Sequence, residues 1–418
     1  MRIAALDLGS NSFHLIVAEA RLDGSFVTIV ADKAMLRLGD VVARTGALGR
    51  TMTDEAIAVL QRFRAIADST KVDEIVAVGT SAIREARDSV AFVDRVRDEV
   101  GIDISVVDGV EEARMIFTAV RASVLIDRPP ALAVDLGGGS VELMIGDQTT
   151  LLYASSVKVG VARVTAKLRP SDPLTQRDRE RLAAHVEDAL APTLAEVRAY
   201  APQMLIGSSG TLTSLAVMAL GEMGEEAPDS LNQLSVPKAA LDAVFEKIFA
   251  LSSGERAKLR GTDAKRAELL PAGAAVLSHL MEATGIDVLT ISEWALREGI
   301  VIESIGAHDR ADLQDDPRAI RRASVMSLCR RSNWRQPHAR QVATLATTLF
   351  DKTAELHQLG EVDRELLEFA ALAHDIGEHI SRTDHDRHAA YLVENGGLRG
   401  FDPNEIRILS AVCRFHVR

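Results

Sequence analysis

The residues from 134 to 143 read Val134-Asp135-Leu136-Gly137-Gly138-Gly139-Ser140-Val141-Glu142-Leu143. An apolar run over residues 131–134 stops at an acid and three glycines, and a second apolar run begins at Val141. This pattern predicts a strand, a tight turn and a second strand. Glycines let the backbone approach a ligand and direct its N–H groups inward, so such a turn can cradle phosphate oxygens. Asp135 would repel phosphate unless a cation or water lay between them, which predicts a metal-assisted phosphate site, although most glycine clusters form only turns.

A second copy of this pattern lies near the N-terminus. It reads Leu6-Asp7-Leu8-Gly9-Ser10-Asn11-Ser12-Phe13-His14-Leu15-Ile16-Val17. Asp7 and Asp135 are 128 positions apart, which is about the length of one domain. Two half-similar lobes that face each other across a cleft are therefore predicted. The arrangement resembles the actin-like ATPase superfamily of sugar kinases, acetate kinase and heat-shock chaperone ATPases, in which two hairpins grip phosphates from opposite sides.

Composition limits the classes of protein that fit this chain. Its 418 residues suffice for two to four domains, and 47% hydrophobic with 26% charged residues is ordinary for a soluble globular protein. The net charge of −12 argues against a broad nucleic-acid-binding surface, so any phosphate site needs a local positive focus. The sequence contains no run of about 18 uncharged apolar residues, and its first predicted strand leaves no room for a signal peptide. No membrane partner is therefore expected. The two cysteines, Cys329 and Cys413, suit a reducing cytoplasm.

The first lobe is predicted to contain strands, helices and one long loop. Strands are expected at about 2–8, 12–20, 25–33, 74–78 and 104–107, and a loop over 36–50 carries Arg37, Arg44 and Arg50. Thr53 is predicted to cap a helix that runs to about Ser69.

Two charged positions of this lobe each allow a structural and a functional interpretation. Arg84 follows the small-residue turn that begins at Gly79, and is predicted in the first turn of a helix. It can either bind an anion there or lie on a solvated helix face. Glu111 and Glu112 open the next helix, where they either complement the helix dipole or supply a base for an attacking water. Sequence spacing alone does not choose between these interpretations.

The second lobe continues from the glycine-rich hairpin. A strand at about 150–158 leads to a helix with Arg163 and Lys167, and a long helix follows over about 173–199. A strand at 203–206 then enters Gly207-Ser208-Ser209-Gly210-Thr211 at the start of an apolar helix, which suits another phosphate or nucleotide contact. Helices at about 237–251, 265–283 and 296–305 and a strand at 288–291 complete the lobe.

The remaining chain changes in character. Residues 309–317 are charged and poor in apolar residues, which predicts a linker, and the region after it is predicted to be all-helical. Seven of the eleven histidines occur from His338 onward. His338, His374-Asp375 and His388 together resemble the HD phosphohydrolase domain, in which His, His-Asp and a later Asp bind a divalent metal. No final Asp can be placed, so the histidines can equally be ordinary core or surface residues.

Five motifs taken together resemble the exopolyphosphatase/guanosine pentaphosphate phosphohydrolase family. They are residues 7–14, 79–86, 111–114, 135–142 and 207–211, in that order. The resemblance implies an α/β fold with two actin-like (ribonuclease H-like) lobes, at 1–125 and 126–308, and an all-α HD-like domain at 309–418. It also implies a homodimer, and the cysteine usage described above predicts a cytoplasmic location.

The resemblance further implies the site. Glu112 matches the family's catalytic base, and Asp135 and Glu142 match acids linked to catalysis and to Mg²⁺. Arg84 matches an arginine on the substrate phosphates. The remaining phosphate-binding residues implied by the match are Asp7, Gly9, Ser10, Asn11, Ser12, Gly137, Gly138, Gly139, Ser140, Gly207, Ser208, Ser209, Gly210 and Thr211.

The expected activity is removal of the terminal phosphate from inorganic polyphosphate. The alternatives are hydrolysis of guanosine pentaphosphate to the tetraphosphate, a polyphosphate- or ATP-dependent phosphotransferase, and a non-catalytic alarmone sensor. The chemistry is coherent from the residues themselves, because phosphoryl transfer needs positioning, charge neutralisation and an oriented nucleophile.

Overall fold

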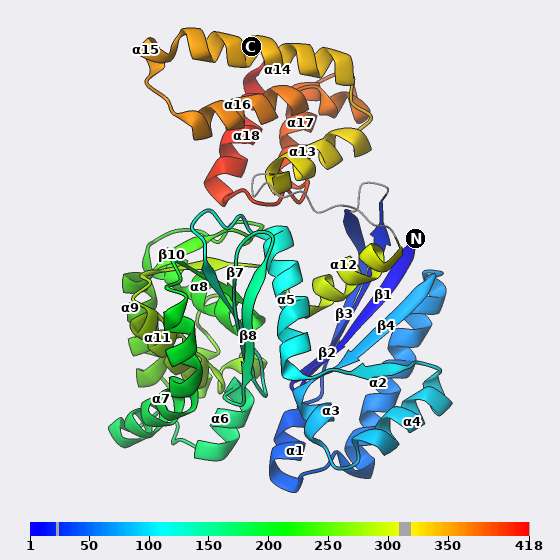
Figure 1. Cartoon of the computed structure of the whole chain (residues 1–418), viewed down its shortest axis with the longest axis vertical. Helices are drawn as coiled ribbons and strands as arrows, with labels where there is room; N and C mark the ends of the chain where they lie inside the picture. The colour runs from blue at the N-terminus through cyan, green and yellow to red at the C-terminus, as the bar shows by residue number, and fades with distance from the viewer. Residues whose placement is uncertain (22–24, 309–318, 418) are drawn as a thin grey trace. The chain divides into compact units, whose positions relative to one another are not determined.

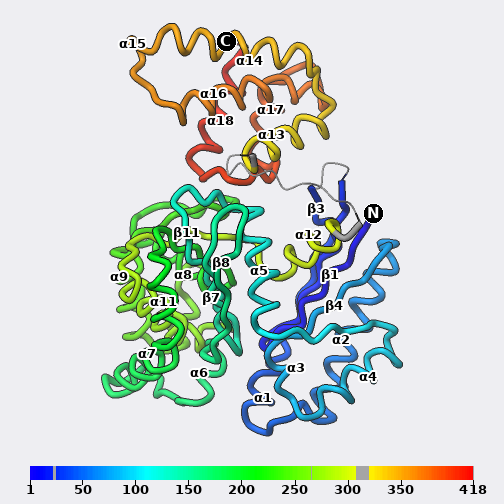
Figure 2. The backbone as a smooth tube through the Cα atoms, viewed as in Figure 1, coloured from blue at the N-terminus to red at the C-terminus, as the bar shows by residue number. Residues whose placement is uncertain are grey.

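The computed structural model describes residues 1–21, 25–308 and 319–417 (Figures 1 and 2). These residues form two compact units, each with its own contacts. The N-terminal unit comprises the described residues of 1–121, 126–227 and 235–308, and the C-terminal unit those of 122–125, 228–234 and 319–417. The linker expected at 309–317 lies outside the described residues. In the described part of the chain, no helix is both long enough and apolar enough to cross a bilayer.

The N-terminal unit contains two sheets with the same strand order. The first runs β3-β2-β1-β4-β5, and the second, read in the matching direction, runs β8-β7-β6-β9-β11 with one further antiparallel strand, β10, at its edge. In each sheet a three-stranded antiparallel meander is followed by parallel strands, β4 and β5 in the first and β9 and β11 in the second. This repetition confirms the α/β fold with two actin-like lobes. The strands are β1 Arg2–Leu8, β2 Ser12–Ala20, β3 Phe26–Met35, β4 Glu74–Gly79, β5 Ile104–Val106, β6 Ala131–Leu136, β7 Val141–Gly146, β8 Leu151–Val157, β9 Met204–Ser208, β10 Ser235–Pro237 and β11 Val288–Ile291.

Helices cover the sheets because the central strands are buried on both faces. Residues 3–6 of β1 are at most 1% exposed, as expected for a strand between helix layers. The core of the first lobe joins Phe13 of β2 to Phe63 and Phe92 of two helices. The helices are α1 Leu38–Thr45, α2 Gly49–Ser69, α3 Ser81–Glu85, α4 Ser89–Val100, α5 Gly109–Ser123, α6 Val161–Leu168, α7 Gln176–Ala199, α8 Gly210–Glu222, α9 Lys238–Ala250, α10 Ser253–Arg256, η1 Ala264–Arg266, α11 Leu270–Thr284 and α12 Leu296–His308.

The start of the first lobe differs from the sequence prediction in two ways. The expected loop over 36–50 contains α1, whose buried residues are only Leu38 and Val42, so its helical pattern is short and weak. Helix α2 begins at Gly49, and Thr53 is buried inside it rather than capping it. The amides of Leu48 and Gly49 instead donate to the carboxylate of Asp88, each over 2.8 Å. A cap supplied from 39 residues away leaves no local signal.

Helix α12 follows the second sheet in sequence but packs against β1 and β2 of the first. Its Gly299 lies directly against the backbone of Met115 in α5, where a Cβ would overlap the Met115 carbonyl. Arg114 of α5 also donates to Glu303 of α12 over 2.8 Å. The close crossing of α5 and α12 brings the first turn of each helix toward the hairpins of the two lobes.

The described residues of the C-terminal unit form helices and no strand, which confirms the expected helical domain. Phe369 and Phe401 meet edge to face in its core at 5.6 Å. Arg321 is buried, stacks on the Phe401 ring and pairs with Glu365 and Glu405. The elements are α13 Ala319–Arg331, α14 Gln336–Lys352, α15 Ala354–His357, α16 Glu361–Ala373, η2 Ile376–His379, α17 His385–Glu394 and α18 Pro403–Phe415.

Candidate active site

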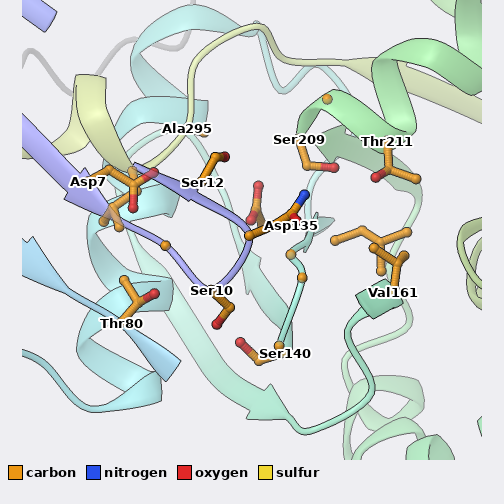
Figure 3. Close-up of a pocket in the computed structure, with 18 of the residues that line it drawn as sticks. Asp7, Ser10, Ser12, Thr80, Asp135, Ser140, Val161, Ser209, Thr211 and Ala295 are labelled. Carbon is orange, nitrogen blue, oxygen red and sulfur yellow. The ribbon is translucent and has the colours of Figure 1, made fainter. Parts of the chain in front are cut away.

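A polar cavity lies between the two hairpin turns of the N-terminal unit (Figure 3). The turns are equivalent in geometry: Gly9 N–H donates to the Ser12 carbonyl at 3.2 Å, and Gly137 N–H donates to the Ser140 carbonyl at 3.0 Å. Predicted site residues that line the cavity are Asp7, Gly9, Ser10, Asn11, Ser12, Glu112, Asp135, Gly137, Gly138, Gly139, Ser140, Ser209, Gly210 and Thr211.

In the first lobe, the residues around the start of α1 bind the carbonyl groups of the hairpin turn. Leu36 and Arg37 N–H groups donate to the Asn11 carbonyl, and Gly39 N–H donates to that of Ser10 at 2.7 Å. The segment expected to be a loop therefore orients the turn.

Helix α6 does the same for the second turn. Val161 N–H donates to the Gly137 carbonyl and Ala162 N–H to the Gly138 carbonyl, both at 3.0 Å. Within the described residues, the N–H groups of Asn11, Gly138 and Gly139 have no acceptor. Backbone amides left free at a turn while its carbonyls are bound elsewhere make an anion-binding concavity.

The two turns touch, and this contact requires glycine. A Cβ at Gly139 would lie 2.7 Å from the Oγ atoms of Ser10 and Ser81. A Cβ at Gly160, just before α6, would lie 2.5 Å from the carbonyl carbon of Gly139. The backbone of the second turn is thus enclosed from both sides.

Strand register brings the acids together. Asp135 lies opposite Glu142 in the antiparallel β6–β7 pair and beside Ser208 of parallel β9. Directly opposite residues project from the same face of a sheet. Ser208 Oγ donates to Asp135 at 2.5 Å, and Ser156 Oγ donates to Glu142 at 2.7 Å. In the first lobe the equivalent pair is Asp7 and His14.

Four carboxyl groups share this region: Glu112 and Glu142 are buried, and Asp7 and Asp135 are half-buried. Burial, opposed by the charge of Arg297 and assisted by that of Asp135, raises the pKa of Asp7 to about 7. Burial also raises the pKa of Asp135, against the Ser208 hydrogen bond. Burial together with the charge of Asp135 raises the pKa of Glu142 to about 7. The protein alone therefore disfavours full ionisation of this cluster.

Glu112 is held at the N-terminus of α5 and is 7% exposed. Burial, and then the neighbouring Glu142, raise its pKa well above the usual glutamate range, while Arg84 opposes that shift. Arg84 Nη1 donates to Glu112 at 3.3 Å and to the Val107 carbonyl at 2.6 Å. The adjacent Glu111 points elsewhere, because its carboxylate binds Arg114.

Four predicted site residues, Arg84, Glu142, Gly207 and Ser208, do not line the cavity. They lie next to residues that do or pack in the strand that leads to it. Arg84 faces Glu112 rather than the open space. Glu142 and Ser208 lie next to Asp135. Gly207 belongs to strand β9, and a Cβ there would lie 2.9 Å from the side chains of Leu212 and Leu289, so close packing explains the glycine.

The cations of the cavity are Arg266 and Arg297, and sequence reasoning missed both. Arg297 Nη1 lies 3.4 Å from His14 Nδ1, and Ser12 Oγ lies 2.7 Å from His14 Nε2. Burial and Arg297 lower the pKa of His14 to about 3, so its imidazole is neutral. The Arg266 guanidinium packs over Gly210 at the start of α8, and its buried Nε has no hydrogen-bond partner among the described residues, with the Asp263 carboxylate 3.8 Å away. Neither arginine belongs to a recognisable motif; only the crossing of α12 onto the first sheet brings Arg297 here.

Ser209 adds strain at the cavity wall. It precedes α8 with φ 92° and ψ 152°, a conformation that only glycine adopts readily, and its Oγ accepts from Leu212 N–H. Such strain is retained where surrounding structure over-determines the backbone, and it concentrates at functional sites.

The carboxyl groups of the cavity have the donor chemistry that Mg²⁺ requires. All the donors are oxygens, which Mg²⁺ prefers, and the repulsion within the cluster favours a cation. Among the described residues, groups of three acid, cysteine or histidine ligand atoms within 4.8 Å of one another occur only in the C-terminal unit. The acids of the cavity therefore do not form a three-ligand metal site by themselves. Mg²⁺ commonly uses one or two carboxylates with water and substrate phosphate, and the site fits that mode.

Comparisons with known proteins show the family to which this chain is similar. Residues 16–308 match the Ppx/GppA phosphatase family, and residues 320–418 match Ppx/GppA phosphatase, domain III. Exopolyphosphatase 1 of Mycobacterium tuberculosis is 31% identical over 82% of this chain and 98% of its own length. The guanosine-5'-triphosphate,3'-diphosphate pyrophosphatase of Aeromonas hydrophila is 28% identical over 98% of this chain and 79% of its own length. The crystal structure of an exopolyphosphatase from Cytophaga hutchinsonii superposes with a TM-score of 0.69 at 29% identity, over 73% of this chain and 98% of that one.

Proposed function

The chain belongs to the Ppx/GppA phosphatase family, and we propose that it is an exopolyphosphatase that hydrolyses the terminal phosphate of inorganic polyphosphate. The observation that carries the proposal is the position of Glu112, a buried carboxyl group of raised pKa at a cavity lined by two turns with free amides. Relatives named exopolyphosphatase support the choice of substrate.

In the proposed reaction the turn amides, Glu112 and the arginines have separate roles. The amides of the two turns hold the terminal phosphate, and ionised Glu112 accepts a proton from water as the water oxygen bonds to phosphorus. The bridging P–O bond breaks, releasing orthophosphate and a chain shorter by one unit. Arg266 and Arg297 offset charge on the phosphate oxygens, while Arg84 keeps Glu112 oriented and favours its ionised form.

Mg²⁺ is part of the proposal. Asp135 and Glu142 would hold it, with Asp7 on the opposite hairpin, and it would neutralise charge shared by these acids and the substrate. Loss of phosphate release after chelation, restored by Mg²⁺, is the expected result.

Guanosine pentaphosphate is the second candidate substrate, because the named pyrophosphatase matches 98% of this chain, including the C-terminal unit. Its terminal phosphate presents the same chemistry to the turns and to Glu112. The two substrates therefore differ only in the part of the molecule that lies beyond the terminal phosphates.

The test is phosphate release by the purified full chain with Mg²⁺. Long-chain polyphosphate and guanosine pentaphosphate are compared at matched terminal-phosphate concentrations, with Glu112→Gln as the catalytic control and Glu111→Gln as its matched neighbour. We expect faster release from polyphosphate, a fall in kcat of about a hundredfold or more for Glu112→Gln, and little change for Glu111→Gln.

Other outcomes identify the alternatives. Preference for the nucleotide makes the chain a guanosine pentaphosphate phosphohydrolase. ATP formation on addition of ADP identifies a phosphotransferase, and tight binding of the nucleotide without release identifies a sensor. Near-wild-type turnover by folded Glu112→Gln removes Glu112 as the base.

A further inference from the structure

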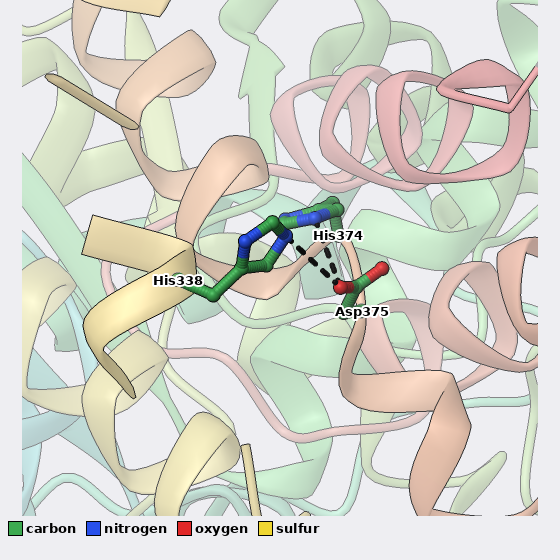
Figure 4. A group of neighbouring side chains, drawn as sticks. All are labelled: His338, His374 and Asp375. Carbon is green, nitrogen blue, oxygen red and sulfur yellow. Dashed lines mark ion pairs between the residues drawn. The ribbon is translucent and has the colours of Figure 1, made fainter. Parts of the chain in front are cut away.

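A separate cluster of four imidazoles surrounds one carboxylate in the C-terminal unit. Asp375 Oδ2 lies 3.2 Å from His374 Nε2 and 3.4 Å from His338 Nε2 (Figure 4). Its other oxygen, Oδ1, lies 3.5 Å from His385 Nε2 and 3.6 Å from His416 Nε2. Each carboxylate oxygen therefore faces its own pair of ring nitrogens.

Segments far apart in sequence converge to make this cluster. His338 lies in the first turn of α14, His374-Asp375 follows α16, His385 begins α17 and His416 follows α18. The rings also contact one another, with centroid separations of 5.4 Å for His338–His374, 5.0 Å for His374–His416 and 5.2 Å for His385–His416. His388, expected in such a site from the sequence, is not part of it, and His385 and His416 take part instead.

Three of the rings are oriented by the backbone. Nδ1 lies 2.8 Å from the Ala371 carbonyl in His374, 3.1 Å from the Arg382 carbonyl in His385, and 2.7 Å from the Cys413 carbonyl in His416. A carbonyl oxygen can only accept, so each Nδ1 carries the proton. In a neutral ring Nε2 is then a lone-pair acceptor.

These Nε2 lone pairs point at a carboxylate, which is also an acceptor. Two acceptors that face each other need either a proton on Nε2 or a cation between them. Protons on all four rings would place four positive charges around one carboxylate, whereas a metal ion satisfies several lone pairs at once. Histidines that ligate a metal usually donate their second nitrogen to a carbonyl or carboxylate, and this fixes the tautomer as it is fixed here.

We propose that Asp375, with the Nε2 atoms of His338, His374, His385 and His416, binds a divalent transition-metal ion. Each of the two groups that share Asp375 keeps three ligand atoms within 4.8 Å of one another, so the cluster has room for one or two ions. Imidazole-rich ligand sets select zinc, iron, nickel, copper or cobalt over Mg²⁺, which prefers oxygen. This site is distinct in its ligands from the all-oxygen site proposed for Mg²⁺, and it goes beyond the proposed function.

The site is open on one side. The His338 side chain is 53% exposed, whereas that of His374 is 10% exposed. Positions on the ion that protein atoms leave free are therefore accessible to water.

The proposal is tested with the full chain, stripped by chelator and titrated with Co²⁺ in excess Mg²⁺. The excess Mg²⁺ occupies the oxygen-rich cavity, and the visible d–d absorption of Co²⁺ reports nitrogen ligation. We expect one or two Co²⁺ per chain, displaced by Zn²⁺, and a dissociation constant raised about tenfold or more in Asp375→Asn and in His338→Ala. His379→Ala, a substitution at an exposed histidine outside the cluster, is the matched control and should bind as wild type does.

No uptake of Co²⁺ or Zn²⁺ by the wild-type chain would overturn the proposal, as would uptake that both substitutions leave unchanged. Folding is checked by circular dichroism for every variant. His338 is largely exposed, so His338→Ala keeps the test decisive if Asp375→Asn fails to fold.

Discussion

At the scale of single residues, the structure shows which of two adjacent glutamates faces the cavity. Glu111 and Glu112 are consecutive in α5, and consecutive helical residues point in directions about 100° apart. Glu111 is half-exposed and points to Arg114, whose hydrogen bond lowers the pKa of Glu111. Glu112 points into the buried cavity, where desolvation raises its pKa. The residue type and position were predictable, but the direction depends on how α5 packs against α12.

Arg84 gives a prediction about pH dependence. The sequence prediction placed Arg84 on the substrate, whereas in the structure it pairs with Glu112 and lowers the pKa of that glutamate. A base acts when ionised, so activity should rise as pH rises through the pKa of Glu112. Arg84→Gln removes the opposing charge, raises that pKa further and shifts the acidic limb of kcat/KM to higher pH.

The measurement is a pH profile of kcat/KM for phosphate release between pH 5 and 9. Arg87→Gln is the control, because exposed Arg87 donates to the Thr45 carbonyl and does not line the cavity, so it should leave the limb in place. An unshifted acidic limb in Arg84→Gln, with a raised KM, would return Arg84 to a role in substrate binding.

At the scale of elements, strong local patterns were predictable and distant support was not. Both glycine-turn hairpins were predicted from their apolar strands and turn residues, and the structure contains them as β1–β2 and β6–β7. Helix α1 was missed because only two of its residues are buried. The start of α2 was misplaced because its amides are bound by Asp88, far along the chain.

Gly160 tests how α6 supports the second turn. A Cβ there would overlap the backbone of Gly139 and Ser140, so Gly160→Ala must push the turn into or away from the cavity. Misplacement of a positioning element by about 1 Å can cost on the order of a hundredfold in rate, so a loss of kcat/KM of that size is expected. The measurement is steady-state phosphate release by protein whose folding is verified by circular dichroism.

Gly221→Ala is the matched control for that substitution. Gly221 lies within α8, and a Cβ there meets nothing within 4 Å. Alanine should therefore leave activity unchanged and stabilise the helix by about 0.4–1 kcal/mol. Equal activity in Gly160→Ala and Gly221→Ala would show that the turn tolerates displacement.

At the scale of the whole molecule, the repeated strand order was predictable because the same motif occurs twice in the sequence. The residues that make up each site were less predictable from the sequence. Arg297 reaches the cavity only because α12 crosses onto the first sheet, and His385 and His416 join His374 through packing of helices α17 and α18. Contacts of this kind depend on tertiary packing, which no local spacing records.

The two units can be followed separately, because one of the two tryptophans lies in each: Trp294 in the N-terminal unit and Trp334 in the C-terminal unit. In a Trp334→Phe background, fluorescence of Trp294 reports unfolding of the N-terminal unit alone. Trp294 packs against Phe26 with ring centroids 4.9 Å apart, so its environment changes on unfolding.

The acid cluster predicts how the stability of that unit depends on pH. The folded state raises the pKa of Asp7 and Glu142 from 3.8 and 4.5 to about 7, so it holds protons that the unfolded chain releases. Their contribution to stability is complete below about pH 4 and is lost as pH rises through 7, at about 1.4 kcal/mol per pH unit for each such proton.

In chelator, the denaturant midpoint from Trp294 should fall between pH 5 and 8, and Mg²⁺ should raise it at pH 8 by replacing the protons. The double variant Asp7→Asn/Glu142→Gln should lose most of both effects, and a midpoint independent of pH and Mg²⁺ in the wild-type cluster would contradict the assignment of a cation to these acids.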